Sequence, residues 1–149
     1  MLISCAFLMA IGCSDDTGLP KRYPVKGTVS YKNQPVEKGR IDFRAEDKGG
    51  RAASGDIIDG SYFLTTSVNG DGAIPGKYKV TVIAVEVEIP ADKLAGPGGG
   101  QAFAQSKARG ELMKKAKILV PKKFWSETTT SLGAEVEERS NKLDFSLED

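Results

Sequence analysis

Val25-Lys-Gly-Thr-Val-Ser-Tyr31 is the stretch that decides the fold class of this chain. Its odd-numbered positions are hydrophobic or small, and the positions between them are polar. This period of two is that of a β-strand with one face in the core and one face in water. The Asn33-Gln-Pro35 run that follows predicts a turn. The first segment of the body is therefore predicted to be a half-buried strand.

The same alternation returns along the chain between turn signals such as Asp59-Gly60 and Pro75-Gly76. In the second strand Asp42, Arg44 and Glu46 are predicted to line a solvated face. Trp125 is predicted to pack at a sandwich edge, with a binding role as the alternative. About seven short strands with turns roughly every 8–12 residues predict an all-β fold, an antiparallel sandwich. The further predicted strands cover residues 41–45, 53–57, 61–65, 78–84, 132–136 and 143–147.

Composition limits the classes of function. The 149 residues suit one domain, and 21 basic against 20 acidic side chains give a net charge of +1. A nucleic-acid-binding protein normally has a clear basic excess, so no nucleic-acid partner is expected. The chain has no histidine, which excludes catalysis by an imidazole base and zinc sites built on histidine.

The N-terminus carries a localisation signal. Residues 2–11 are apolar and uncharged, but the run is shorter than the roughly 20 residues of a membrane-spanning helix. The run has the size of the apolar region of a signal peptide, and residues 1–12 are predicted to be such a signal. Ala10-Ile-Gly-Cys13 resembles the lipobox of bacterial lipoproteins, although Ala10 stands where leucine is commoner. The alternatives are a buried N-terminal strand and an ordinary secretory signal with an incidental cysteine.

The lipobox resemblance implies cleavage before Cys13 and acylation of that residue, which anchors the protein to a membrane. Cys5 leaves with the signal, so the mature domain has no thiol available for catalysis or a disulfide. Residues 13–24 are polar, contain glycine and proline, and are predicted to be a tether. Residues 25–149 form the domain.

Longer segments resemble a known family. Residues 25–36 are similar to the opening of carboxypeptidase regulatory-like, transthyretin-like domains, and residues 73–80 resemble their recurrent Pro-Gly-x-Tyr segment. Residues 119–124 and 130–132 resemble short planctomycete lipoproteins that carry this domain. The resemblance implies a seven-stranded transthyretin-like or Ig-like sandwich with an accessory role and no catalytic residues. The related hydrolases of the urate pathway use histidines, which this chain lacks.

The β pattern stops between Val87 and Ile118, which predicts an insertion near residues 88–117. Residues 97–100 are Pro-Gly-Gly-Gly, and residues 101–117 have helical spacing. One interpretation of the basic run here is a surface for anionic lipid, phosphate or an acidic partner. The other is a solvated crossover whose lysines pair loosely with the acidic C-terminal strands. The run has seven basic residues against Glu111 alone: Lys107, Arg109, Lys114, Lys115, Lys117, Lys122 and Lys123.

No motif predicts a cofactor or a metal. Asp56, Asp59 and Asp71 offer oxygen ligands for calcium, but the residue register of a calcium loop is missing. We therefore expect no enzyme but a lipid-anchored, non-catalytic binding or structural module of the cell envelope. It is expected at a bacterial membrane, on the periplasmic face or the cell surface, in contact with protein or glycan. The alternative is a polysaccharide-binding accessory domain that serves an envelope hydrolase.

Overall fold

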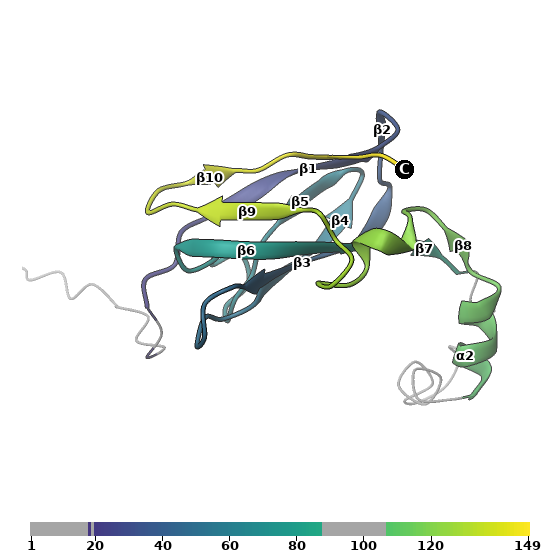
Figure 1. Cartoon of the computed structure of the whole chain (residues 1–149), viewed down its shortest axis with the longest axis horizontal. Helices are drawn as coiled ribbons and strands as arrows, with labels where there is room; N and C mark the ends of the chain where they lie inside the picture. The colour runs from purple at the N-terminus through teal and green to yellow at the C-terminus, as the bar shows by residue number, and fades with distance from the viewer. Residues whose placement is uncertain (1–17, 19, 88–106) are drawn as a thin grey trace, which may run out of the picture.

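Short strands are the main regular structure of the molecule (Figure 1). The computed structural model describes residues 18, 20–87 and 107–149. The helical elements are α2 (Lys107–Lys114) and the short 3-10 helix η2 (Lys122–Phe124). The strands are β1 (Val25–Tyr31), β2 (Gln34–Pro35), β3 (Lys38–Ala45), β4 (Ala53–Ile58), β5 (Ser61–Phe63), β6 (Gly76–Ile83), β7 (Val85–Glu86), β8 (Lys117–Ile118), β9 (Gly133–Val136), β10 (Asn141–Lys142) and β11 (Phe145–Leu147).

One curled sheet carries the fold, with its strands in the order β10-β1-β5-β4-β3-β6-β9. Strands β7 and β8 form a separate two-stranded sheet. The arrangement confirms the predicted all-β sandwich, in which most neighbouring strands are antiparallel. The exceptions are β10 and β11, which both run parallel to β1. The alternation of residues does not predict this direction, because it is the same for either orientation of a strand.

The inner faces of the strands form the core. In β6, Tyr78, Val80 and Val82 are buried, as their alternation with polar residues predicts. Aromatic rings fill the middle, with Phe43 5.7 Å from Tyr78 and 6.0 Å from Phe145 between ring centroids. These distances are those of tilted and edge-on aromatic pairs. The core therefore joins side chains from strands far apart in the sequence.

Two tight hairpins set the register of the sheet. Lys32 and Asn33 both have positive φ (49° and 62°), as do Asp59 and Gly60 (48° and 77°). Two successive residues of positive φ are typical of type I′ turns, whose twist matches that of the flanking strands. The first turn lies one residue earlier than the Asn33-Gln-Pro35 run predicts, because Pro35 belongs to β2.

The C-terminal segment closes the sheet against β1. At Gly27 a side chain is not possible, because a Cβ atom there would lie 1.9 Å from the carbonyl oxygen of Leu143. The Leu143 amide donates to the Lys26 carbonyl (2.9 Å), and the Tyr62 hydroxyl donates to the Leu143 carbonyl (2.7 Å). Burial raises the pKa of the Tyr62 phenol. It stays neutral and keeps the proton that it donates.

A buried asparagine stabilises the turn between β9 and β10, the two strands at the ends of the sheet order. Asn141 is 5% exposed and follows the turn that connects β9 to β10. Its Oδ1 accepts a hydrogen bond from the Glu137 amide (2.9 Å), and its Nδ2 donates to the Glu137 carbonyl (3.1 Å). The Asn141 side chain therefore provides hydrogen-bond partners for the amide and the carbonyl of Glu137 in the turn from β9 to β10.

The last residues of the predicted tether are bound to the domain. Tyr23 and Ala73 exchange backbone hydrogen bonds of 2.9 and 3.0 Å, and Arg22 Nε lies 2.8 Å from Asp71 Oδ2. The chain is thus fixed from Arg22 onward, three residues before the predicted domain boundary at Val25. Residues 1–17, which include the predicted signal peptide and Cys13, lie outside the described residues. Within the described ranges, no helix is long and apolar enough to cross a membrane.

Candidate binding site beside Trp125

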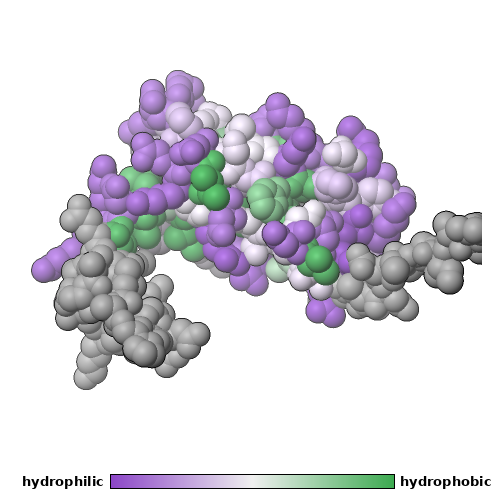
Figure 2. Space-filling view, turned by 180° about the vertical axis from the view of Figure 1, so that it is seen from behind, coloured by the Kyte–Doolittle hydropathy of each residue, from purple (hydrophilic) through white to green (hydrophobic). Residues whose placement is uncertain are grey.

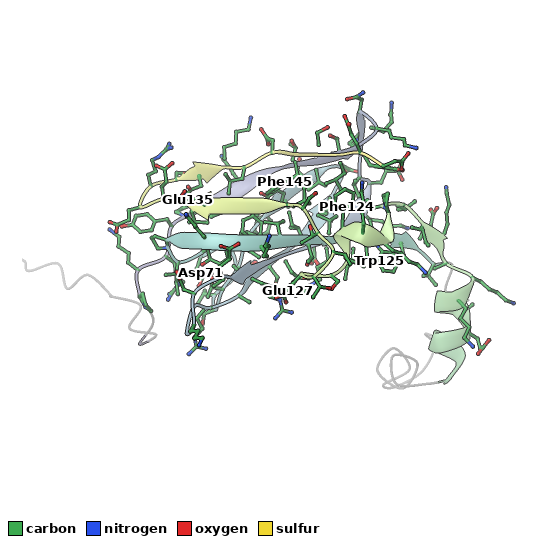
Figure 3. The ribbon with its side chains drawn as sticks, viewed as in Figure 1. Asp71, Phe124, Trp125, Glu127, Glu135 and Phe145 are labelled. Atoms are coloured by element: carbon green, nitrogen blue, oxygen red, sulfur yellow. The ribbon has the colours of Figure 1, made fainter. Side chains whose placement is uncertain are left out.

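The domain has two distinct ends (Figure 1). Ala73, which pairs with Tyr23, lies three residues before β6, and β7 begins two residues after β6 ends. Strand β6 has eight residues, which span about 26 Å at roughly 3.3 Å each. Asp71 and Glu135 lie toward the end where the tether joins, and Trp125 lies toward the opposite end (Figure 3). We call these the tether end and the far end.

At the far end the two-stranded sheet brings the limits of the insertion together. Val85 pairs with Ile118 and Glu86 pairs with Lys117. Helix α2 (Lys107–Lys114) falls within the predicted helical stretch of residues 101–117, while residues 88–106 lie outside the described residues. The chain therefore leaves and rejoins the body at neighbouring positions.

The seven predicted basic residues divide between this insertion and the body. Lys107, Arg109 and Lys114 are in α2, Lys115 follows it, and Lys117 is in β8. The side chains of Lys107 and Arg109 are not among those described. Lys114 pairs with Glu111 (2.7 Å) and Lys117 with Glu86 (3.4 Å). These two lysines thus pair with acids of α2 and β7, and not with those of the C-terminal strands.

Lys122 and Lys123 belong to the body, because η2 is packed into the core. Val120 and Phe124, on either side of these lysines, are 0% and 3% exposed. The Lys122 ammonium lies 5.8 Å from the centroid of the Trp125 ring, and that of Lys123 lies 4.9 Å from the centroid of the Phe124 ring. Cation–π contacts at exposed sites contribute about 0.5–1 kcal/mol. Both contacts lie within η2 and the residue after it, so they order this segment, while the burial of Phe124 attaches it to the core.

Beside η2 lies a hollow of about 420 Å³. It lies on the outer face of β3 and β6, where the loop that follows η2 passes over them. Trp125 and Glu127, which both line it, are labelled on that loop in Figure 3. We call this hollow the Trp125 groove. Its lining residues are Asp42, Arg44, Thr81, Ile83, Trp125, Ser126, Glu127 and Thr128.

Trp125 is fixed by its polar atoms. Its amide donates to the Lys122 carbonyl (3.0 Å), and its Nε1 donates to the Val120 carbonyl (3.0 Å). The indole N–H is the only polar group of this side chain. Since that group is already bonded to the body, the side chain offers hydrocarbon surface to a ligand.

The loop that covers the outer face is tied to β6. Thr130 Oγ1 donates to the Val80 carbonyl (2.7 Å), and the Val80 amide donates to the Leu132 carbonyl (3.0 Å). As a result Thr81 is only 5% exposed, although its neighbours in β6 point into the core. The floor of the Trp125 groove therefore includes a strand that is paired on both sides, with β3 and with β9.

The rim of the groove carries paired charges. Arg44 Nε lies 3.5 Å from Glu127 Oε1, and Arg40 Nε donates to Asp42 Oδ1 (3.0 Å). Side chains of the first pair are 55% and 54% exposed, and exposed ion pairs contribute only about 0–1 kcal/mol. Each acid of the rim has an arginine partner, so the rim is close to neutral.

Two other hollows are smaller. One of about 260 Å³ lies between the β1–β2 hairpin and β8, lined in part by Tyr31 and Lys117. The other, of about 220 Å³, lies on the outer face of β4 and β5 beside Ile58 and Phe63, which are 65% and 54% exposed. On the face shown in Figure 2, hydrophobic residues form several separate groups bordered by hydrophilic ones. Scattered apolar residues of this kind are normal on a protein surface.

The carboxylates considered for calcium are arranged differently. Asp71 accepts the backbone amides of Thr66 (2.7 Å) and Val68 (2.9 Å) and pairs with Arg22. Burial raises the pKa of Asp71, but the amides and the guanidinium outweigh it and lower the pKa below 3.8. Asp56 is in β4 and Asp59 is in the turn after it. Among the residues with described positions, no three His, Cys, Asp or Glu side chains gather as metal ligands would.

Comparison with known protein families, with curated proteins and with solved structures finds no match to this chain. The resemblance to carboxypeptidase regulatory-like, transthyretin-like domains thus stays a prediction from the sequence. Of the groove residues, Trp125 was expected at a sandwich edge and Asp42 and Arg44 on a wet strand face. No sequence pattern brings Glu127 to them, because that contact depends on how the loop folds back over β3 and β6.

Proposed function

We propose that this protein is a lipid-anchored, non-catalytic binding or structural module of the bacterial cell envelope that contacts a protein or a glycan with its far end. The observation that carries the proposal is the separation of the two ends along β6. The chain joins the domain through Tyr23 and Ala73 at one end, while the two-stranded sheet and Trp125 lie at the other.

The length of the tether supports a partner away from the anchoring bilayer. With Arg22 fixed on the domain, nine residues from Cys13 to Lys21 are left as tether, or roughly 30 Å when extended. Attraction between exposed charges is largely screened beyond about 8–10 Å at physiological salt. When the tether end faces the membrane, Lys117, Lys122 and Lys123 lie beyond the reach of its headgroups. This geometry favours an envelope partner over the anchoring lipid surface.

The anchor is tested by metabolic labelling with palmitate. We expect the wild type to incorporate label and Cys13→Ala to lose it and move to the soluble fraction. Cys5→Ala is the matched control, since Cys5 lies in the segment that the signal peptidase would remove. Equal labelling of the wild type and Cys13→Ala would contradict lipid anchoring.

The far end is tested by a photo-crosslinking residue placed in turn at two exposed positions in living cells. Ile118 lies in β8 at the far end and is 47% exposed, and Glu135 lies in β9 toward the tether end. We expect position 118 to give discrete crosslinked species that position 135 does not give. Crosslinks confined to position 135 would contradict the proposal and place the contact with the partner at the tether end.

A second candidate function is that of a polysaccharide-binding accessory domain that serves an envelope hydrolase. The Trp125 groove favours it, because a shallow site with one aromatic side chain and several hydrogen-bonding groups suits a sugar. The test is co-sedimentation of the protein with insoluble envelope polysaccharide, compared with the variant Trp125→Ala. Loss of sedimentation in this variant is the expected result, and equal sedimentation of both proteins would contradict it.

A further inference from the structure

We propose that the Trp125 groove binds an uncharged sugar unit of a glycan. This inference deepens the glycan contact of the proposed function and names the place and the chemistry of the ligand. It depends on three features of the groove, which are its apolar surface, its hydrogen-bonding groups and its charge.

The apolar surface comes from Trp125 and Ile83. The Trp125 N–H is bonded to the body (3.0 Å), so the indole contributes hydrocarbon, and Ile83, which also lines the groove, is 36% exposed. A pyranose ring has C–H groups on its faces and hydroxyls around its edge. A ligand with a flat apolar face therefore matches this pair of side chains, and an aromatic side chain provides the largest contact area.

The hydrogen-bonding groups lie around that apolar surface. Arg44 presents several N–H donors in a plane, and Glu127 and Asp42 present pairs of acceptor oxygens. Such planar groups can bond two neighbouring hydroxyls at once. Arg44 and Glu127 are already held 3.5 Å apart. Sharing these groups with sugar hydroxyls costs little, because an exposed ion pair is weak.

The charge of the groove selects an uncharged ligand. Asp42 is bonded to Arg40 (3.0 Å) and Glu127 to Arg44, which leaves no excess of positive charge. The groove's own lining holds two acids, Asp42 and Glu127, and one base, Arg44, so the carboxylate of a uronic acid or an acidic peptide would meet more negative than positive charge. A neutral sugar avoids this repulsion, so it is the ligand that the groove favours.

Trp125 is also the reporter for the experiment, because it is the only tryptophan of the chain. The mature lipoprotein in detergent is titrated with cellopentaose, xylopentaose and chitopentaose, and with pentagalacturonate as the anionic probe. We expect at least one neutral oligosaccharide to change the tryptophan emission saturably, and pentagalacturonate to change it less at the same concentration. No saturable change with any neutral probe, or tighter binding of the anionic probe, would overturn the proposal.

Variants then place the ligand in the groove. Calorimetry should show at least a tenfold higher Kd for Arg44→Ala, as expected from the loss of a hydrogen bond to a charged group. Trp125→Ala should abolish binding. Since that variant also removes a contact with the body, Glu127→Ala, whose side chain is 54% exposed, provides a second variant that leaves the packing intact.

Matched controls remove similar side chains elsewhere. Arg51→Ala removes an exposed arginine and Phe63→Ala an exposed aromatic residue, both outside the groove. We expect both to bind within twofold of the wild type. Unchanged binding by Arg44→Ala and Glu127→Ala would exclude this groove as the site. Palmitate labelling at Cys13 is independent of sugar binding, so failure of this inference and failure of the anchor give different results.

Discussion

Asp144 accepts two hydrogen bonds from Thr28 on one carboxylate oxygen, from its backbone amide (2.8 Å) and from its hydroxyl (2.9 Å). The pair lies between the two places where the C-terminal segment forms a ladder with β1, at Val25–Lys26 and at Val29–Tyr31. Here the carboxylate takes the place of a backbone carbonyl as the partner of the Thr28 amide. Attachment of the last strand therefore depends in part on an ionised group.

Acid should weaken this attachment. The Thr28 hydroxyl and amide hold the pKa of Asp144 below its ordinary value of 3.8, against a smaller opposing effect of desolvation. A carboxyl with a lowered pKa in the folded state contributes stability above its unfolded pKa. That contribution is lost as the pH falls through the folded value. We expect the urea midpoint of the wild type to fall below about pH 4 more steeply than that of Asp144→Asn, which keeps an acceptor oxygen without a charge.

The measurement is urea unfolding of both proteins between about pH 2 and pH 6. Comparison of the two removes the contributions of Asp71, Glu137 and Asp149, whose pKa values are also lowered. Parallel curves for the wild type and Asp144→Asn would contradict the prediction.

Alanine at position 27 should disrupt the closure of the sheet. Its Cβ would lie 1.9 Å from the Leu143 carbonyl oxygen, a backbone atom that cannot move alone. We expect Gly27→Ala to lower the free energy of unfolding by about 1–3 kcal/mol or more. Gly110→Ala is the control, because no atom lies within 4 Å of its new Cβ and alanine favours a helix by up to about 1 kcal/mol. Equal stabilities of the two variants in denaturant titrations would argue against this packing.

Removal of the residues just before β1 should destabilise the domain. Arg22 and Tyr23 bind Asp71 and Ala73, and the Asp71 side chain is only 12% exposed. A chain that starts at Val25 leaves these groups without their partners, at a cost of about 1–3 kcal/mol relative to a chain that starts at Lys21. Thermal and urea unfolding of the two proteins measure the difference. Identical midpoints would show that these contacts add nothing to stability.

The insertion should be removable at little cost. Val85 and Ile118 are paired neighbours, so a short Gly-Ser linker that replaces residues 88–114 only has to join two adjacent strands. Loop-closure entropy changes by about 0.6 kcal/mol for each doubling of loop length. We expect the shortened protein to keep its single thermal transition and β-type circular dichroism. Failure to fold would mean that residues of the insertion belong to the core.

The alternation of apolar and polar residues was enough to predict strands β1 and β6 and the faces that they turn to the core. The alternation predicted that Val25 and Val29 are buried and that Tyr78, Val80 and Val82 share the core face of β6. Both predictions hold because each strand packs on a single core. The alternation did not give the parallel direction of β11, which depends on where the chain returns after β9. Val120 and Phe124 are also buried, yet they lie in a 3-10 segment for which no period of two exists.

The basic run shows the same limit for the candidate site. Sequence proximity grouped Lys117 with Lys122 and Lys123, but the first pairs with Glu86 on the two-stranded sheet and the others lie over aromatic rings of the body. The Trp125 groove combines side chains of β3, β6 and the loop after η2. Such a combination depends on long-range pairing, which one sequence does not contain as a local signal.

The pairing of β11 with β1 also bears on the order in which the chain can fold. Val29 pairs with Phe145, and Thr28 bonds to Asp144, 116 residues away. Strand β1 thus keeps one open edge until residues 144–147 have been made. Contacts of such separation make folding slow, and an unpaired strand edge can pair with other chains. During synthesis, the pairing of β1 and the closure of the core therefore remain incomplete until β11 has been made.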